Sequence, residues 1–252
     1  MDDTPRPVGE HLGELRRRLF WVIGTWLVLA GAAGSVVSEV FRVLMAPAVE
    51  AFLEAGRTLI AIAPAELFLT YVKTALLAGF LASMPMTLYQ GWAFIAPGLY
   101  ERERRFALPF VFSASLLFAV GCAFGYFIAF PQAIQFLLGL EADYVEQAWT
   151  MQAVFAFMAR LYLAFGLAFE LPIVLVFLAL AGVVEPRTLA RQRKYAILIL
   201  FVAAAILTPQ DVASQILLAI PLCLLYEISI WLSYALVRRR RSETSRSEAS
   251  PP

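Results

Sequence analysis

Acidic side chains inside the long apolar runs are the residues of this sequence best suited to do chemistry. Glu170 stands about halfway along the apolar region 155–184, two residues before Pro172. An ionisable group in hydrocarbon is expensive and is expected to serve function, although a neutral Glu170 that hydrogen-bonds a neighbouring helix is the structural alternative. Glu227, in the last apolar region, is a further carboxylate with no obvious mate.

Two other acidic groups stand beside arginines outside these runs. Glu14 precedes three arginines at 16–18, and Glu103 lies where acids alternate with arginines at 101–105. Spacing alone favours solvated surface charge, with an i,i+4 ion pair between Glu14 and Arg18 worth about a few tenths of a kcal/mol. The functional alternative is a carboxylate that receives a guanidinium from a partner, a planar bidentate contact that lysine cannot reproduce.

A polar turn, Thr-Pro-Gln-Asp at 208–211, interrupts the last apolar region. Proline cannot supply a helical donor and aspartate is costly in hydrocarbon, so this turn is expected at a membrane interface. Polar side chains are normal there. The alternative is that Thr208 and Gln215 form hydrogen bonds with another transmembrane helix.

Signatures of catalysis are missing from the sequence. It contains no H-E-x-x-H, no G-x-S-x-G and no phosphate-binding lysine loop. The single histidine precedes the first apolar run, and both cysteines lie inside apolar runs. We therefore predict no catalytic residue, no cofactor and no metal site. The net charge of +1 argues against nucleic-acid binding.

Membrane-spanning helices must position these groups, because 61% of the 252 residues are hydrophobic and only 15% are charged. Runs of about 20 apolar residues cross the hydrocarbon. We predict an all-α integral membrane protein with one domain, 1–237, and a basic, then disordered tail, 238–252. The six expected spans are about 19–38, 72–96, 106–130, 155–181, 195–207 and 212–237.

Two features of this arrangement are unusual. The fifth span is short, since its 13 residues reach only about 20 Å against about 30 Å of hydrocarbon, and the bilayer must thin there or other helices must cover it. Between the first two spans, apolar residues from Phe41 to Leu53 recur at helical spacing and predict a helix on the outer interface. Pro47 should kink or split that helix.

Basic residues set the orientation. Sixteen Lys and Arg lie in the N-terminal segment, two loops and the tail, against two in the opposite loops. Both termini are therefore expected in the cytoplasm. The first 35 residues also imitate a cleavable signal peptide, but an uncleaved first helix is simpler, because removal would leave five spans and reverse the order of basic loops. No transit peptide is visible, which favours a bacterial plasma (inner) membrane.

Five motifs occur in order along nearly the whole chain, from residue 11 to about 231. They are H-L-x-E-L-R-x-R-L at 11–19, P-x-x-x-Y-Q-x-W-x-F-x-x-P-x-L at 85–99, E-R-R at 103–105, F-G-x-x-F-E-x-P at 165–172 and T-P-x-D-x-x-S-Q-x-x-L-A-x-P at 208–221. Together they resemble the TatC family, the six-helix core of twin-arginine protein translocases. One departure is Gln210, where Thr-Pro-Pro-Asp is common in the family.

The resemblance implies a receptor that binds twin-arginine signal peptides of folded proteins. It would work in an oligomeric complex with single-span TatA- and TatB-type partners and draw on the proton-motive force. By position, Glu14 and Glu103 match the carboxylates that bind the arginine pair, and Glu170 matches an intramembrane glutamate facing a groove in a concave bundle. Thr208 and Gln215 match the partner-docking surface, and Pro47 and Phe94 match positions read as structural.

The competing class is a small proton-coupled solute or ion transporter that uses Glu170 and Glu227 as proton sites. It predicts uptake by the purified protein alone in liposomes, whereas a translocase subunit depends on its partners. No internal repeat is visible, so the inverted-repeat signature of many secondary transporters is missing. The resemblance favours the translocase.

Overall fold

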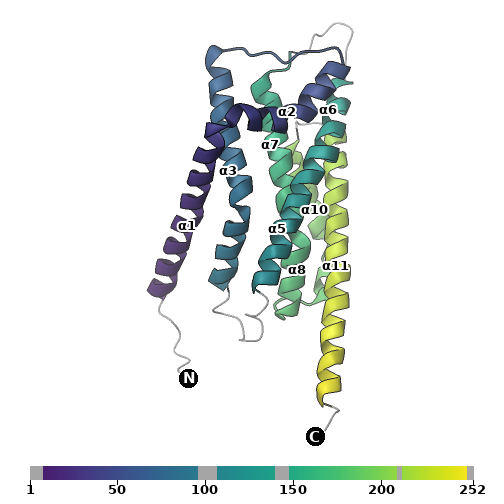
Figure 1. Ribbon diagram of the computed structural model, residues 1–252. Coiled ribbons are helices and arrows are strands. Elements are labelled where there is room, and N and C mark those ends of the chain that lie inside the picture. Colours follow the sequence, from purple (N-terminus) through teal and green to yellow (C-terminus); the bar gives the residue numbers. More distant parts are fainter. Residues whose placement is uncertain (1–7, 96–106, 140–147, 209–211, 249–252) are drawn as a thin grey trace. The chain divides into compact units, whose positions relative to one another are not determined.

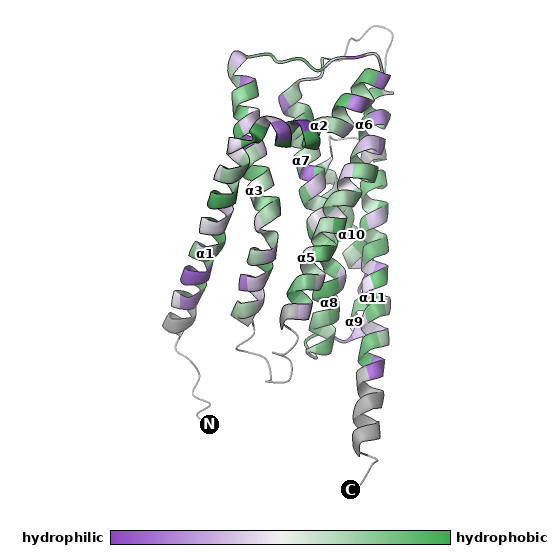
Figure 2. Cartoon of the chain, in the orientation of Figure 1, coloured by the Kyte–Doolittle hydropathy of each residue, from purple (hydrophilic) through white to green (hydrophobic). Residues whose placement is uncertain are grey.

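The computed structural model describes residues 8–95, 107–139, 148–208 and 212–248, and these are almost entirely helical (Figure 1). Apolar residues cover most of the length of the helices (Figure 2). Five segments among the described residues are long and apolar enough to cross a membrane: Leu12–Ser35, Pro64–Phe94, Pro109–Leu138, Met151–Leu180 and Gln215–Arg239. The predicted all-α membrane fold is confirmed.

The described residues form two compact units. The first takes residues from Met1–Ala46, Ile60–Leu116 and Thr150–Gln152. The second takes residues from Pro47–Leu59, Leu117–Trp149 and Ala153–Pro252. A single membrane domain over 1–237 stays a prediction.

The first unit is built on the pairing of α1 (Val8–Ser35) with α3 (Pro64–Ile95). A Cβ atom on Gly79 would lie 2.4 Å from the backbone nitrogen of Ala30, so only glycine permits this approach of the two backbones. Nearby, the indole Nε1 of Trp26 donates to the Leu76 carbonyl at 2.9 Å. The two helices are thus held in a defined register.

Helix α2 (Val37–Glu54) follows α1 and contains Pro47 in its interior. The helix expected between the first two spans is therefore present, and Pro47 does not split it. Met45, Ala48 and Phe52 form a buried stripe at helical spacing. Within the second unit, the Phe52 ring packs edge-on against Trp149, with centroids 5.6 Å apart.

The third predicted span is a helix that changes its winding. Helix α5 (Ala107–Phe124) continues through a π-helical turn, η2 (Gly125–Ala129), into α6 (Phe130–Leu138), and so extends beyond the predicted end at 130. It packs against α7 (Met151–Ala168). A Cβ on Gly121 would lie 2.4 Å from the Phe165 carbonyl oxygen, so these two backbones also meet at a glycine.

The fourth predicted span is broken in its middle. Helix α7 ends at Ala168, and α8 (Leu171–Leu180) begins after a short turn that contains Glu170. Pro172 lies in the first turn of α8, where its missing amide hydrogen costs nothing. The proline therefore sets the position of the break and places Glu170 at it.

The chain ends with α9 (Pro186–Arg191), α10 (Arg193–Leu207) and α11 (Val212–Glu248). Helix α10 has 15 residues, a length of about 22 Å, which confirms the short fifth helix. Helix α11 runs on to Glu248, so most of the predicted disordered tail is helical. No Gly or Pro occurs there before residue 251 to end the helix.

Candidate functional site

The carboxylate of Glu14 is bound by an arginine of its own helix. Glu14 Oε1 accepts hydrogen bonds from Nη2 of Arg18 at 2.5 Å and from Nε at 3.1 Å. Both side chains are less than one-fifth exposed. The guanidinium also donates from Nη1 to Oε1 of Gln90 on α3, at 3.2 Å. The predicted i,i+4 pair is confirmed, and Gln90 ties it to the neighbouring helix.

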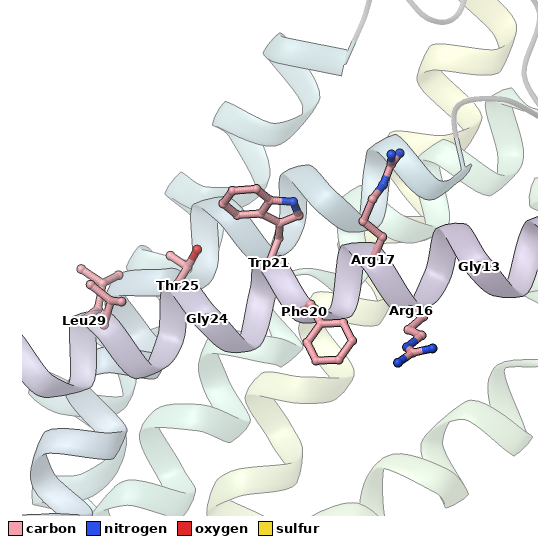
Figure 3. A pocket seen from close by; sticks show the side chains of 9 residues that line it. Gly13, Arg16, Arg17, Phe20, Trp21, Gly24, Thr25 and Leu29 are labelled. Atoms are coloured by element: carbon pink, nitrogen blue, oxygen red, sulfur yellow. The ribbon is translucent and has the colours of Figure 1, made fainter.

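The two other arginines of this motif point elsewhere. Figure 3 shows Arg17 and Trp21 projecting from one side of α1, and Arg16 and Phe20 from the other. The Arg16 guanidinium lies over the Phe20 ring, 5.6 Å from its centroid. Of the three, Arg18 is therefore the arginine that occupies Glu14.

A hollow of about 770 Å³ runs beside this part of α1 (Figure 3). It extends from Gly13, next to Glu14, to Leu29, and its walls include Phe20 and Trp21. A Cβ on Gly13 or Gly24 would meet nothing within 4 Å, so the glycines leave the hollow open.

Glu103 lies outside the described residues, as does the rest of its E-R-R motif. A joint site of Glu14 and Glu103 is therefore still a prediction.

Glu170 is buried at the break between α7 and α8, with 8% of its surface exposed. Its Oε1 has no hydrogen-bond partner among the described residues. Phe169, beside it in sequence, packs on the Phe124 ring with centroids 5.7 Å apart. The structural alternative of a hydrogen bond to a neighbouring helix leaves this oxygen unexplained, because an unpaired buried acceptor is costly.

Thr208 and Gln215 both bond to the backbone of α10. The Thr208 hydroxyl donates to the Ala204 carbonyl at 3.0 Å, and Gln215 Nε2 donates to the Phe201 carbonyl at 3.0 Å. These donors are used within the α10–α11 hairpin. For a bond to a partner helix, Gln215 keeps its second amide hydrogen as a donor and its amide oxygen as an acceptor.

The interpretation of Glu227 as a carboxylate without a mate is wrong. Its Oε1 lies 2.8 Å from Nε of Arg193, and the side chain is more than one-third exposed. The partner stands 34 residues earlier on another helix, where sequence spacing gives no signal. A carboxylate paired with an arginine is not an unpartnered intramembrane group, so the transporter alternative loses one of its two unpaired carboxylates.

Two residues read as structural occupy helix interiors. Pro47 lies half-buried in α2, and Phe94 lies half-buried in the last turn of α3. Their roles stay predictions.

Sequence reasoning missed Glu66, which is only 6% exposed. Its Oε2 accepts the amide hydrogen of Ile62 at 2.7 Å, and its Oε1 accepts that of Gln152 at 2.9 Å. Gln152 is in the first turn of α7, so this one carboxylate joins the starts of two helices. Its position in the first turn of α3, after Pro64, is a helix-start signal, but the partner 86 residues away is not visible in sequence.

The long apolar helices define a multi-pass membrane protein. The family model described as Sec-independent protein translocase protein (TatC) matches residues 10–221. The chain belongs to the TatC family.

Relatives and a solved structure agree. The Sec-independent protein translocase protein TatC of Desulforapulum autotrophicum is 44% identical, over 91% of this chain and 84% of its own length. That of Aquifex aeolicus is 42% identical, over 93% and 98%. A crystal structure of the twin arginine translocase receptor TatC superposes with a TM-score of 0.81 at 43% identity, covering 89% of this chain and 98% of that one.

Proposed function

We propose that this protein is the receptor subunit of a twin-arginine translocase and that Glu14 binds an arginine of the signal peptide. The observation that carries the proposal is the guanidinium of Arg18 on the Glu14 carboxylate, at 2.5 and 3.1 Å. A carboxylate so placed accepts the fork of an arginine, and lysine lacks that fork.

Binding would proceed by exchange of one guanidinium for another. The signal arginine takes the place of Arg18 on Glu14. The carboxylate therefore keeps a positively charged partner throughout, in a site with little solvent. Arg18 already donates to Gln90, which gives the displaced side chain an acceptor. Glu103 takes the second arginine, and the apolar stretch of the signal lies in the hollow beside α1.

Groups of the second unit would serve the later steps of transport. The unpaired oxygen of Glu170 offers a polar contact within the membrane, and single-span TatA- and TatB-type partners dock on α10 and α11 at Thr208 and Gln215. The short α10 supports local thinning of the bilayer. We expect Glu170→Ala to lower export of several cargoes together, and unchanged export would make Glu170 structural.

The positive-inside rule supports a location in the bacterial plasma membrane with both termini in the cytoplasm. In that orientation, Glu14 faces the side from which cargo arrives. The proton-motive force would drive transport.

Signal-peptide binding to the detergent-purified protein tests the proposal. An Arg-Arg peptide should bind more tightly than its Lys-Lys twin, and Glu14→Ala should abolish the preference. Glu54→Ala removes an exposed carboxylate of α2 and serves as the control. Equal affinity for both peptides in the wild-type protein would contradict the receptor role of Glu14.

A further inference from the structure

A second hollow lies in the second unit, where α9 meets the C-terminal half of α11. Its volume is about 290 Å³, close to the lower bound of ligand pockets. Its walls are Glu185, Pro186, Arg187, Tyr234, Val237 and Arg238. The proposed path of a signal peptide involves none of these residues.

The two arginines of this hollow carry charge that the described part of the chain does not neutralise. Neither Arg187 nor Arg238 has a hydrogen bond or ion pair there, whereas Arg193, two residues after α9, pairs with Glu227 at 2.8 Å. Glu185 is exposed at the rim and lies beyond ion-pair distance of both. Two unpaired guanidinium groups in one hollow favour an anion, above all a phosphate.

The depth of the hollow places it at the edge of the hydrocarbon. The apolar stretch of α11 ends at Arg239, and that of α7 and α8 ends at Leu180, shortly before Arg187. In Figure 2, α11 is coloured mostly hydrophobic, with a hydrophilic segment near the end of its coloured part. Arginines at such a depth lie at the level of lipid phosphates, with their stems along the apolar surface.

Exposed aromatic side chains mark the same level. Trp231 is 73% exposed and Tyr234 is 42% exposed, and they lie about two turns and about one and a half turns before the end of the apolar stretch of α11. Trp and Tyr gather at the headgroup region because one end of the ring is apolar and the other polar. A soluble phosphate would need no such belt beside its site.

We propose that this hollow binds the headgroup of an anionic phospholipid. Arg187 and Arg238 hold the phosphate from α9 and α11, the Tyr234 hydroxyl donates to one of its oxygens, and the acyl chains lie along Val237 and Trp231. Basic pockets between transmembrane helices bind acidic headgroups in this way. The bound lipid would tie α9 to α11 at the start of the short α10.

Native mass spectrometry of the full chain in dodecyl maltoside tests this site. Phosphatidylglycerol is titrated first and phosphatidylcholine separately. We expect one phosphatidylglycerol to bind the wild-type protein more tightly than phosphatidylcholine. Arg187→Gln with Arg238→Gln should weaken phosphatidylglycerol binding roughly 30-fold, at the strength typical of two arginines at an anionic surface. The loss for phosphatidylcholine should be smaller, because its choline cation already offsets the phosphate that the arginines hold.

The matched control is Arg191→Gln with Arg239→Gln, which removes the same charge from the same two helices outside the hollow. It should retain phosphatidylglycerol, and circular dichroism should show both variants folded. Tyr234→Phe, a change of one hydroxyl, should weaken binding by a factor of a few. Equal retention by the hollow variant and the wild type, or equal loss in the control, would overturn the site.

Inorganic phosphate separates the lipid from a soluble anion. If the hollow binds a lipid, millimolar phosphate should leave phosphatidylglycerol bound, because the acyl chains contribute apolar contacts that phosphate lacks. If phosphate displaces the lipid from the wild type, and itself binds the wild type but not the hollow variant, the occupant is a soluble phosphate and the lipid proposal fails.

Discussion

Two carboxylates of the first unit lie near opposite ends of α3 and are bound in opposite ways. Glu66 accepts two backbone amides, from Ile62 and Gln152, at 2.7 and 2.9 Å. Glu14 accepts a side-chain group, the guanidinium of Arg18. Backbone donors leave only if the chain around them unfolds, whereas a side chain rotates away. Glu66 is therefore suited to hold the fold together, and Glu14 is suited to exchange one partner for another.

Glu66→Ala should have the largest effect on stability. It removes two charge-assisted hydrogen bonds and leaves two backbone amides without acceptors, a loss of about 3 kcal/mol or more in the free energy of unfolding. Thermal unfolding of the detergent-purified protein measures it. Glu54→Ala is again the control and should unfold like the wild type, since Glu54 is exposed. An unchanged midpoint for Glu66→Ala would refute its holding role.

Glu14→Gln should weaken peptide binding strongly and change stability little. Loss of the charged acceptor should weaken binding of an Arg-Arg signal peptide roughly ten-fold. Its effect on stability should stay below about 1 kcal/mol, because an i,i+4 pair contributes little. Peptide binding and unfolding are measured on the same preparations, with Glu66→Gln as the counterpart that unfolds earlier. If Glu14→Gln and Glu66→Gln both lose stability and neither loses affinity for the Arg-Arg peptide, the contrast between the two carboxylates is wrong.

The same contrast explains what the sequence could predict. The pair of Glu14 with Arg18 follows from spacing within one helix, and the short α10 follows from the length of an apolar run. Glu66 with Gln152, and Glu227 with Arg193, join residues 86 and 34 positions apart. Their contacts depend on how the helices pack, which periodicity does not encode.

The interruptions of the helices also differ in whether the sequence signals them. Pro172 signals the break that places Glu170, because proline has a defined backbone effect. The π-turn Gly125–Ala129 has no such signal, since a single extra residue in a turn follows from packing against α7. The candidate site was thus predictable in its residue types and in its local pairs, but not in its contacts between helices.

Arg18→Gln tests the role of Glu14 through a smaller change in peptide affinity. If Arg18 occupies the site that a signal arginine takes, its removal frees the carboxylate and should tighten Arg-Arg peptide binding by about two- to five-fold, the strength of an i,i+4 ion pair at the upper end of its range. The affinity of Arg18→Lys for the Arg-Arg peptide should lie between those of the wild type and of Arg18→Gln. The control is Arg42→Gln, which removes an exposed arginine of α2 that does not line the hollow. Weaker binding after Arg18→Gln would mean that Arg18 positions Glu14 instead of competing for it.

Gln90→Leu is the finest test, because the amide oxygen of Gln90 bonds to Arg18, while its amide nitrogen contacts Met86 of its own helix. Its Oε1 accepts Arg18 at 3.2 Å, so in the exchange scheme it holds the displaced guanidinium. Removing this acceptor should weaken Arg-Arg peptide binding by about two- to five-fold, the value of one net hydrogen bond. In an Arg18→Gln background the same change should have no effect, since no guanidinium remains to be held. A double-mutant cycle measures this coupling. Equal effects of Gln90→Leu in both backgrounds would show that Gln90 acts on the peptide or on α3 itself, and not through the exchange of Arg18.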